Sequence, residues 1–202
     1  MESPLVPRKE LLVVAGPNGA GKSTFVASFL SERPCPCLCA DLIATEFQHL
    51  DAVSQQVVAG REFLRRMEGQ LTAGEDFVVE TTLSGRTLRN FLARAQAAGF
   101  SITVFFIYLD SAETCVARVK QRVRRGGHRV PEDDIRRRFA RSCSNFWRIY
   151  RQIADYWYVV YNSSGDFKWI ASGEADAILV HEEPAFRQFL RLAGVSDVEI
   201  DD

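Results

Sequence analysis

The sequence lacks the long apolar runs that would place the protein in a membrane. No run approaches the ~18–20 residues that a membrane-spanning helix needs, and no internal repeat, low-complexity tract or long linker interrupts the chain. The first ten residues, MESPLVPRKE, are polar and broken by proline, unlike a secretory signal peptide. We therefore expect a cytoplasmic protein without membrane contacts, whose five cysteines are reduced thiols.

A set of zinc ligands is missing as well. Cys35, Cys37 and Cys39 alternate along the chain and would share one face of a strand. No complementary group of cysteine or histidine accompanies them nearby, and three thiols alone make a poor zinc site. We expect no zinc there.

Net charge is nearly absent, at −1 over 202 residues, but it is unevenly spread. Segment 118–141 holds ten Arg or Lys residues against three Asp or Glu, whereas residues 173–202 hold eight acids against two bases. A protein that coats nucleic acid would tend to be basic throughout, so we do not expect a nucleic-acid partner. The basic segment favours a localised anion site. The alternative is a solvated helix face whose arginines pair with the acidic tail.

What the sequence does contain is an alternation of short apolar runs with longer helical patterns. Its length and its hydrophobic fraction of 47% fit one globular domain, residues 1–202. The first four runs are almost continuously apolar, as in strands buried on both faces of a parallel sheet. Strands are predicted at 11–15, 37–40, 77–79, 102–109 and 156–161, with edge strands at 168–171 and 177–180. Helices are predicted at 22–30, 51–71, 86–98, 112–125, from 131 to about 153, and at 184–192.

The most specific motif is Gly16-Pro17-Asn18-Gly19-Ala20-Gly21-Lys22-Ser23, which fits G-x-x-x-x-G-K-[ST] between a strand and a helix. Glycines let the backbone approach an anion closely, and successive N–H groups form a nest for phosphates at the helix N-terminus. Lys22 would bind the β- and γ-phosphates, and the Ser23 hydroxyl would ligate Mg²⁺. No Asn/Thr-Lys-x-Asp segment follows a strand, so ATP is favoured over GTP. The predicted ATP-binding residues of this loop are Gly16, Asn18, Gly19, Ala20, Gly21, Lys22, Ser23 and Thr24.

This motif predicts an α/β fold of the P-loop NTPase type, with three α/β/α layers and a central, mostly parallel sheet. Ligands of such sheets bind beyond the carboxyl ends of the strands. Asp41 and Glu80 each follow a predicted strand, so both are expected at the same edge as the loop. Asp41 is the candidate base that orients the acceptor hydroxyl and takes its proton. Glu80, Thr81 and Thr82 suit a polyhydroxylated substrate or a Mg²⁺-bound water, although both acids could instead cap turns.

Arginines in segment 118–141 indicate a lid. Arg118, Arg122 and Arg125 recur at i, i+4 and i+7 and so share one helix face. A Gly-Gly-His sequence at 126–128 then interrupts the helix, and Arg138 and Arg141 follow on the next one. Closure of such a lid, at about 118–141, would exclude water and neutralise charge in the transition state.

Several motifs in order resemble the zeta-toxin family of P-loop kinases. They are LLVVAGPNGAGKST, ADLIA at 40–44, AGR at 59–61, ETTLSG at 80–85, RVRRGGHRVPEDDIRRRFARS at 122–142 and Asn162-Ser163, over roughly residues 11–165. The resemblance implies phosphorylation, with ATP or GTP, of a nucleotide sugar; UDP-N-acetylglucosamine, at its 3′-hydroxyl, is the family's known substrate. It also implies that Asp41 is the base, that Arg61, Glu80 and Thr82 lie in the sugar-nucleotide pocket, that lid arginines bind the transferring phosphate, and that Asn162 lies near the adenine. An antitoxin-like protein partner would fit the family, but one chain does not identify it.

Two other functions stay open from the residues. A nucleic-acid end could be the acceptor, with the basic lid binding the strand. Alternatively, ATP could order the lid so that it recruits a protein, without any transfer of phosphate to a metabolite.

Overall fold

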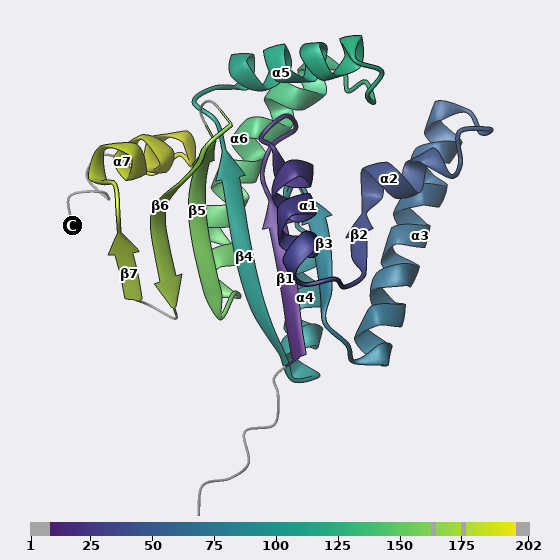
Figure 1. Ribbon diagram of the computed structural model, residues 1–202, viewed down its shortest axis with the longest axis horizontal. Helices are drawn as coiled ribbons and strands as arrows, with labels where there is room; N and C mark the ends of the chain where they lie inside the picture. The colour runs from purple at the N-terminus through teal and green to yellow at the C-terminus, as the bar shows by residue number, and fades with distance from the viewer. Residues whose placement is uncertain (1–8, 163–164, 175–176, 197–202) are drawn as a thin grey trace, which may run out of the picture.

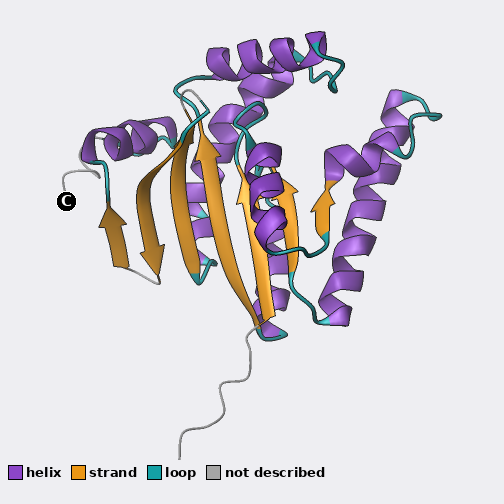
Figure 2. Cartoon of the chain, viewed as in Figure 1, coloured by secondary structure: helices purple, strands orange, loops and turns teal. Residues whose placement is uncertain are grey.

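The computed structural model describes residues 9–162, 165–174 and 177–196 and folds them around one seven-stranded sheet (Figures 1 and 2). The strands lie in the order β2-β3-β1-β4-β5-β6-β7. Their bounds are β1 Lys9–Ala15, β2 Cys37–Cys39, β3 Phe77–Thr81, β4 Phe100–Tyr108, β5 Tyr156–Asn162, β6 Phe167–Glu174 and β7 Ala177–Val180. The α-helices are α1 Lys22–Glu32, α2 Ala40–Thr45, α3 Ala52–Ala73, α4 Leu88–Ala97, α5 Ala112–Arg124, α6 Glu132–Arg148 and α7 Glu183–Leu192, and a 3₁₀ turn spans Tyr150–Gln152.

The sheet is parallel from β2 to β5, and β6 and β7 extend it antiparallel. Strand β1 lies between β3 and β4, with Val14 in register with Glu80 on one side and with Phe105 on the other. The carboxyl ends of the five parallel strands therefore meet at one edge of the sheet. The loop after β1, the end of β3 and helix α2 all lie at this edge.

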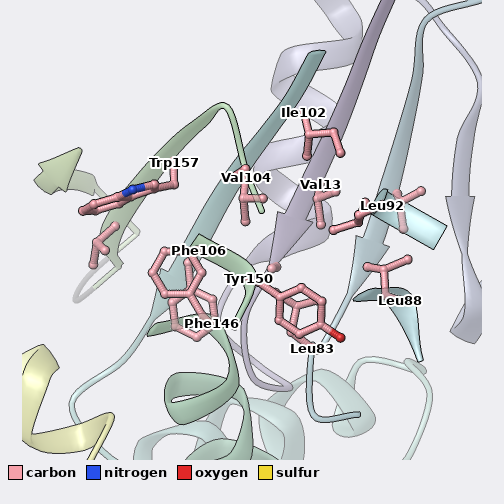
Figure 3. Close-up of a cluster of buried hydrophobic side chains, with 14 of the residues drawn as sticks. Val13, Leu83, Leu88, Leu92, Ile102, Val104, Phe106, Phe146, Tyr150 and Trp157 are labelled. Atoms are coloured by element: carbon pink, nitrogen blue, oxygen red, sulfur yellow. The ribbon is translucent and has the colours of Figure 1, made fainter. Parts of the chain in front are cut away.

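Helices cover both faces of the sheet, which gives the three-layer α/β/α fold expected from the sequence (Figure 1). Helices α1 and α5 pack on one face through a core that includes Val26 and Val119. Helices α4 and α7 and the second half of α6 pack on the other, larger core. There the rings of Phe106 and Phe146 stack with centroids 4.5 Å apart, beside the fully buried Trp157 (Figure 3).

Local sequence signals explain several element boundaries. The side chain of Asp51 accepts hydrogen bonds from the amides at the start of α3, and Ser111 Oγ accepts one from Thr114 N at the start of α5. Gly99 follows α4 with φ of +89°, a backbone conformation that suits glycine. The predicted edge strands and closing helix are confirmed as β6, β7 and α7.

The structure differs from the prediction at several places, of which three are the most informative. Helix α2 was not expected, but Ala40-Asp41-Leu42-Ile43-Ala44 continues directly from β2 without a turn residue and turns into a helix. Helix α4 begins at Leu88 rather than at residue 86. The helix that follows Pro131 ends at Arg148, where the chain tightens into the 3₁₀ turn. In the described parts of the chain, no helix has both the length and the apolar character that crossing a membrane requires.

Candidate nucleotide-binding site

The loop between β1 and α1 has a backbone that side chains would not permit. Gly16, Gly19 and Gly21 have φ of +138°, +83° and +98°. A Cβ atom on Gly16 would lie 1.9 Å from the carbonyl oxygen of Ile107 in β4, so the loop starts in direct backbone contact with the sheet. Gly21 immediately precedes α1, which points the free N–H groups of the first turn toward the loop. The arrangement is that of an anion-binding loop.

Lys22 and Ser23 begin α1 and extend from this loop. Lys22 is buried and its Nζ donates a hydrogen bond to Pro17 O at 3.1 Å. Burial lowers the pKa of Lys22 from its ordinary value, while the carboxylates of Glu80 and Asp41 act in the opposite direction. The low dielectric constant around a buried ammonium strengthens its attraction to the oxygens of a bound phosphate.

Ser23 and Glu80 are brought together by the strand order. Ser23 Oγ donates to Glu80 Oε1 at 3.0 Å, because β3 lies next to β1. A hydroxyl and a carboxylate are the hard oxygen ligands that Mg²⁺ prefers. These two residues therefore fit a magnesium ion that would take its remaining ligands from water and phosphate oxygens.

One cleft of about 880 Å³ joins these groups. Residues of the loop, helix α2 and helix α5 line it. These elements lie at the carboxyl edge of the sheet (Figure 1). Asp41 lies in the first turn of α2 and lines the cleft together with Lys22 and Glu80. The residues that line it are Asn18, Gly19, Gly21, Lys22, Ser23, Thr24, Cys39, Asp41, Leu42, Thr45, Glu80, Arg118, Val119, Gln121, Arg122, Arg125, Gly127, His128, Asn162, Gly165 and Phe167.

The three arginines that share one face of the predicted helix all line this cleft, but they have different surroundings. Arg118 Nη2 donates to the backbone oxygen of Asn162 at 3.0 Å. Arg122 Nη2 donates to His128 O at 2.9 Å, so its guanidinium lies against the glycine turn that follows α5. Arg125 caps the C-terminal end of α5 at the cleft.

Other charges of the basic segment pair with acids of α5 and α6. Lys120 Nζ lies 2.7 Å from Glu132 Oε1, and Arg136 pairs with Glu113. Arg138 Nη2 lies 3.7 Å from Oδ2 of Asp134, which is one turn earlier on α6. These ion pairs join α5 to α6, or residues within α6, which is the solvated-helix arrangement that the sequence left open, although with local acids as partners.

Six residues that the sequence proposed for the site are not among the described residues that line the cleft: Gly16, Ala20, Arg61, Thr81, Thr82 and Arg138. Arg61 is exposed on α3. Thr81 Oγ1 accepts from Leu83 N at 3.2 Å, and the hydroxyls of Thr82 and Ser84 lie 2.9 Å apart. These hydroxyls thus shape the turn after β3, where Leu83 has φ of +53°.

The cleft also contains residues that the sequence analysis did not single out. Gln121 lies on the same face of α5 as the arginines, three residues after Arg118, and Thr45 follows Asp41 by one helical turn. Helical spacing could have identified both. Phe167 comes from β6, whose antiparallel return beside β5 was not encoded in any local motif.

Comparison with known proteins agrees with the fold. A family model described as an AAA domain, AAA_33, matches residues 11–142, from β1 through most of α6. The chain belongs to this AAA domain family. An uncharacterized protein of Haemophilus influenzae is 28% identical over 134 residues, which cover 66% of this chain and 95% of that protein.

Solved structures share the fold at low sequence identity. A chain of the AvrRxo1-ORF1:-ORF2 crystal structure with ATP superposes with a TM-score of 0.69 at 19% identity, over 90% of this chain and 63% of that one. This protein thus spans less than two thirds of that chain's length. A chain of the PezAT chromosomal toxin-antitoxin system of Streptococcus pneumoniae gives 0.66 at 12% identity, over 97% and 83%. These likenesses confirm the P-loop kinase-like fold that the zeta-toxin resemblance implied.

Proposed function

We propose that the protein is a Mg²⁺-dependent kinase that transfers the γ-phosphate of ATP to a hydroxyl group of a small molecule. The proposal rests on one observation: the phosphate-binding loop, Asp41, the Ser23–Glu80 pair and arginines of α5 line the same cleft. A phosphate-binding site alone would not need a carboxylate on the wall opposite the lid. A transferase needs one, to orient the attacking hydroxyl and accept its proton.

Each group then has a role. The loop N–H groups and Lys22 would bind the triphosphate. Ser23 and Glu80 would hold the metal, which would neutralise charge at the phosphates. Asp41 holds the acceptor hydroxyl through a hydrogen bond and takes its proton. Arg122 and Arg125, which line the cleft, would bind oxygens of the transferring phosphate once the glycine turn at 126–127 moves.

A nucleotide sugar such as UDP-N-acetylglucosamine is the candidate acceptor. The resemblance to zeta toxins supports it, and so does a cleft volume that would admit both a nucleotide and part of a second ligand. In this proposal Arg61 and Arg138 would reach the acceptor only after α3 or α6 moves. Thr81 and Thr82 would reach it only after the turn that follows β3 rearranges, because none of these four residues lines the cleft described here.

The test is a screen of a metabolite extract with labelled ATP. The wild type should label one acceptor, and Asp41→Asn should lower the transfer rate by about 10²–10⁴-fold while ATP still binds, as expected for loss of a general base. Asp76→Asn is the matched control, because Asp76 lies at the opposite edge of the sheet, where it accepts a hydrogen bond from Glu10 N. Normal transfer by Asp41→Asn would refute the assigned base.

Two other outcomes would favour the alternatives. Transfer to an oligonucleotide end, with a steep loss at higher salt, would indicate a nucleic-acid-end kinase. One structure of similar fold is the Pnkp1/Rnl/Hen1 RNA repair complex, with a TM-score of 0.56 at 16% identity, over 70% of this chain and 46% of that one. ATP binding without transfer to any acceptor, unchanged in Asp41→Asn, would indicate a nucleotide-dependent binding module.

A further inference from the structure

Asn162 ends β5 with its side chain bonded on both sides. It is buried, and its Nδ2 donates to Ala20 O in the phosphate-binding loop at 2.8 Å. Its Oδ1 accepts from Gly165 N, in the connection to β6, at 3.1 Å. A Cβ atom on Gly21 would lie 2.4 Å from Nδ2, so the amide packs directly against the loop backbone.

Helix α5 also contacts Asn162 and the phosphate-binding loop. The backbone oxygen of Asn162 accepts the hydrogen bond from Arg118. Beside it, a Cβ atom on Gly19 would lie 2.8 Å from Cys115 O, so α5 also contacts the loop backbone. The loop, α5 and the β5–β6 connection therefore share Asn162 as a common partner.

We propose that Asn162 is a positioning residue that fixes the phosphate-binding conformation of the loop and does not itself recognise the base. This inference rests on the proposed nucleotide binding. In one peptide unit the C=O and the next N–H point in opposite directions. Asn162 holds Ala20 O on its own side, and this directs Gly21 N–H to the other side. Gly21 has positive φ, and glycine adopts either sign readily. Without the Asn162 bond, the peptide can rotate and present its oxygen where phosphate needs an N–H donor.

Inorganic tripolyphosphate separates the two roles, because it has the phosphates of ATP but no base. We expect Asn162→Ala to lower the affinities of the protein for ATP and for tripolyphosphate by the same factor, about tenfold or more. Calorimetry measures both affinities. The affinity for GTP should fall by that factor too, so the ratio of the ATP affinity to the GTP affinity stays constant. Asn145→Ala is the matched control: Asn145 is a second buried asparagine, whose Nδ2 donates to Leu83 O outside the cleft, and its loss should leave all three affinities unchanged. Asn162→Ser, a smaller and still polar change, is measured in the same way if Asn162→Ala does not fold.

The outcomes are distinct. Equal weakening of both ligands supports the positioning role. If Asn162→Ala weakens ATP but not tripolyphosphate, Asn162 acts on the base and the positioning role is refuted, while the kinase proposal stands. Unchanged affinity for both ligands also refutes it. If the wild type binds neither ligand, the proposed function and this inference fail together.

Discussion

Gly19 has a positive φ and lies in close contact with helix α5, and replacing it with alanine tests both features. Gly19 has φ of +83°, and its Cα faces α5 so closely that a Cβ would lie 2.8 Å from Cys115 O and 3.3 Å from Val119 Cγ2. The backbone oxygen belongs to a helix and cannot rotate aside. Gly19→Ala must therefore either distort the loop or push α5, with its arginines, away from it.

The magnitude follows from two costs. The left-handed backbone conformation costs an alanine about 1–2 kcal/mol relative to glycine. Crowding against a packed helix adds about 1–3 kcal/mol. Gly99 provides the matched control, because it has φ of +89° and nothing within 4 Å of its Cβ position. Gly99→Ala should therefore lose only the free energy that the left-handed backbone conformation costs.

The assay is thermal and urea unfolding of both variants. At roughly 2–4 °C per kcal/mol for a chain of this size, the Tm of Gly19→Ala should lie about 2–12 °C below that of Gly99→Ala. Gly19→Ala should also bind ATP more weakly, whereas Gly99→Ala should bind it normally. Equal Tm values for the two variants would refute the packing of α5 on the loop.

Three further perturbations have defined outcomes. Lys22→Met should abolish measurable ATP binding by calorimetry while the fold, measured by circular dichroism, persists; retained binding would exclude this loop as the phosphate site. Gly173→Ala would place a Cβ 2.3 Å from the ring of Trp157, so it should destabilise the protein by about 1–3 kcal/mol and shift the fluorescence of this buried tryptophan, and an unchanged spectrum would contradict the packing. Burial raises the pKa of Cys115 and of Cys143 to about 12. In the unfolded chain these thiols lose protons near pH ~8.5, so the native state holds more protons above that pH, and the free energy of unfolding should fall between about pH 9 and 12. Urea midpoints across this range should fall less steeply in Cys143→Ala than in the wild type.

The sequence predicted most where the signal was local. The loop motif and the apolar runs of β1, β3 and β4 depend only on neighbouring residues, and the structure has each of them. Asp41 and Glu80 could be placed at the loop's edge because parallel strands share their direction. The element that carries Asp41 was not predicted, since this residue lies within a helix that begins where its strand ends.

The remaining features depend on contacts between distant segments. The Ser23–Glu80 hydrogen bond needs β3 to lie beside β1, which no local pattern specifies. The arginines share a face, as predicted, but whether a guanidinium is held by a backbone carbonyl depends on where β5 and the glycine turn lie. Arg61 is a further example. Its helix could be predicted from the sequence, but the direction in which the exposed side of that helix faces could not.

Helix α3 has a consequence for how the cleft can change shape. Its second half is fixed in the core by Met67, whereas Val53 near its start is 74% exposed. Gln55 Nε2 donates to Ala44 O at 2.7 Å, and Arg66 pairs with Glu46, so the short helix α2 is fastened to α3 at two points. Because α2 begins directly after β2, Asp41 stays next to the sheet. A bend of α3 would therefore move the wall of the cleft at Thr45, at the other end of α2, more than it would move Asp41 itself.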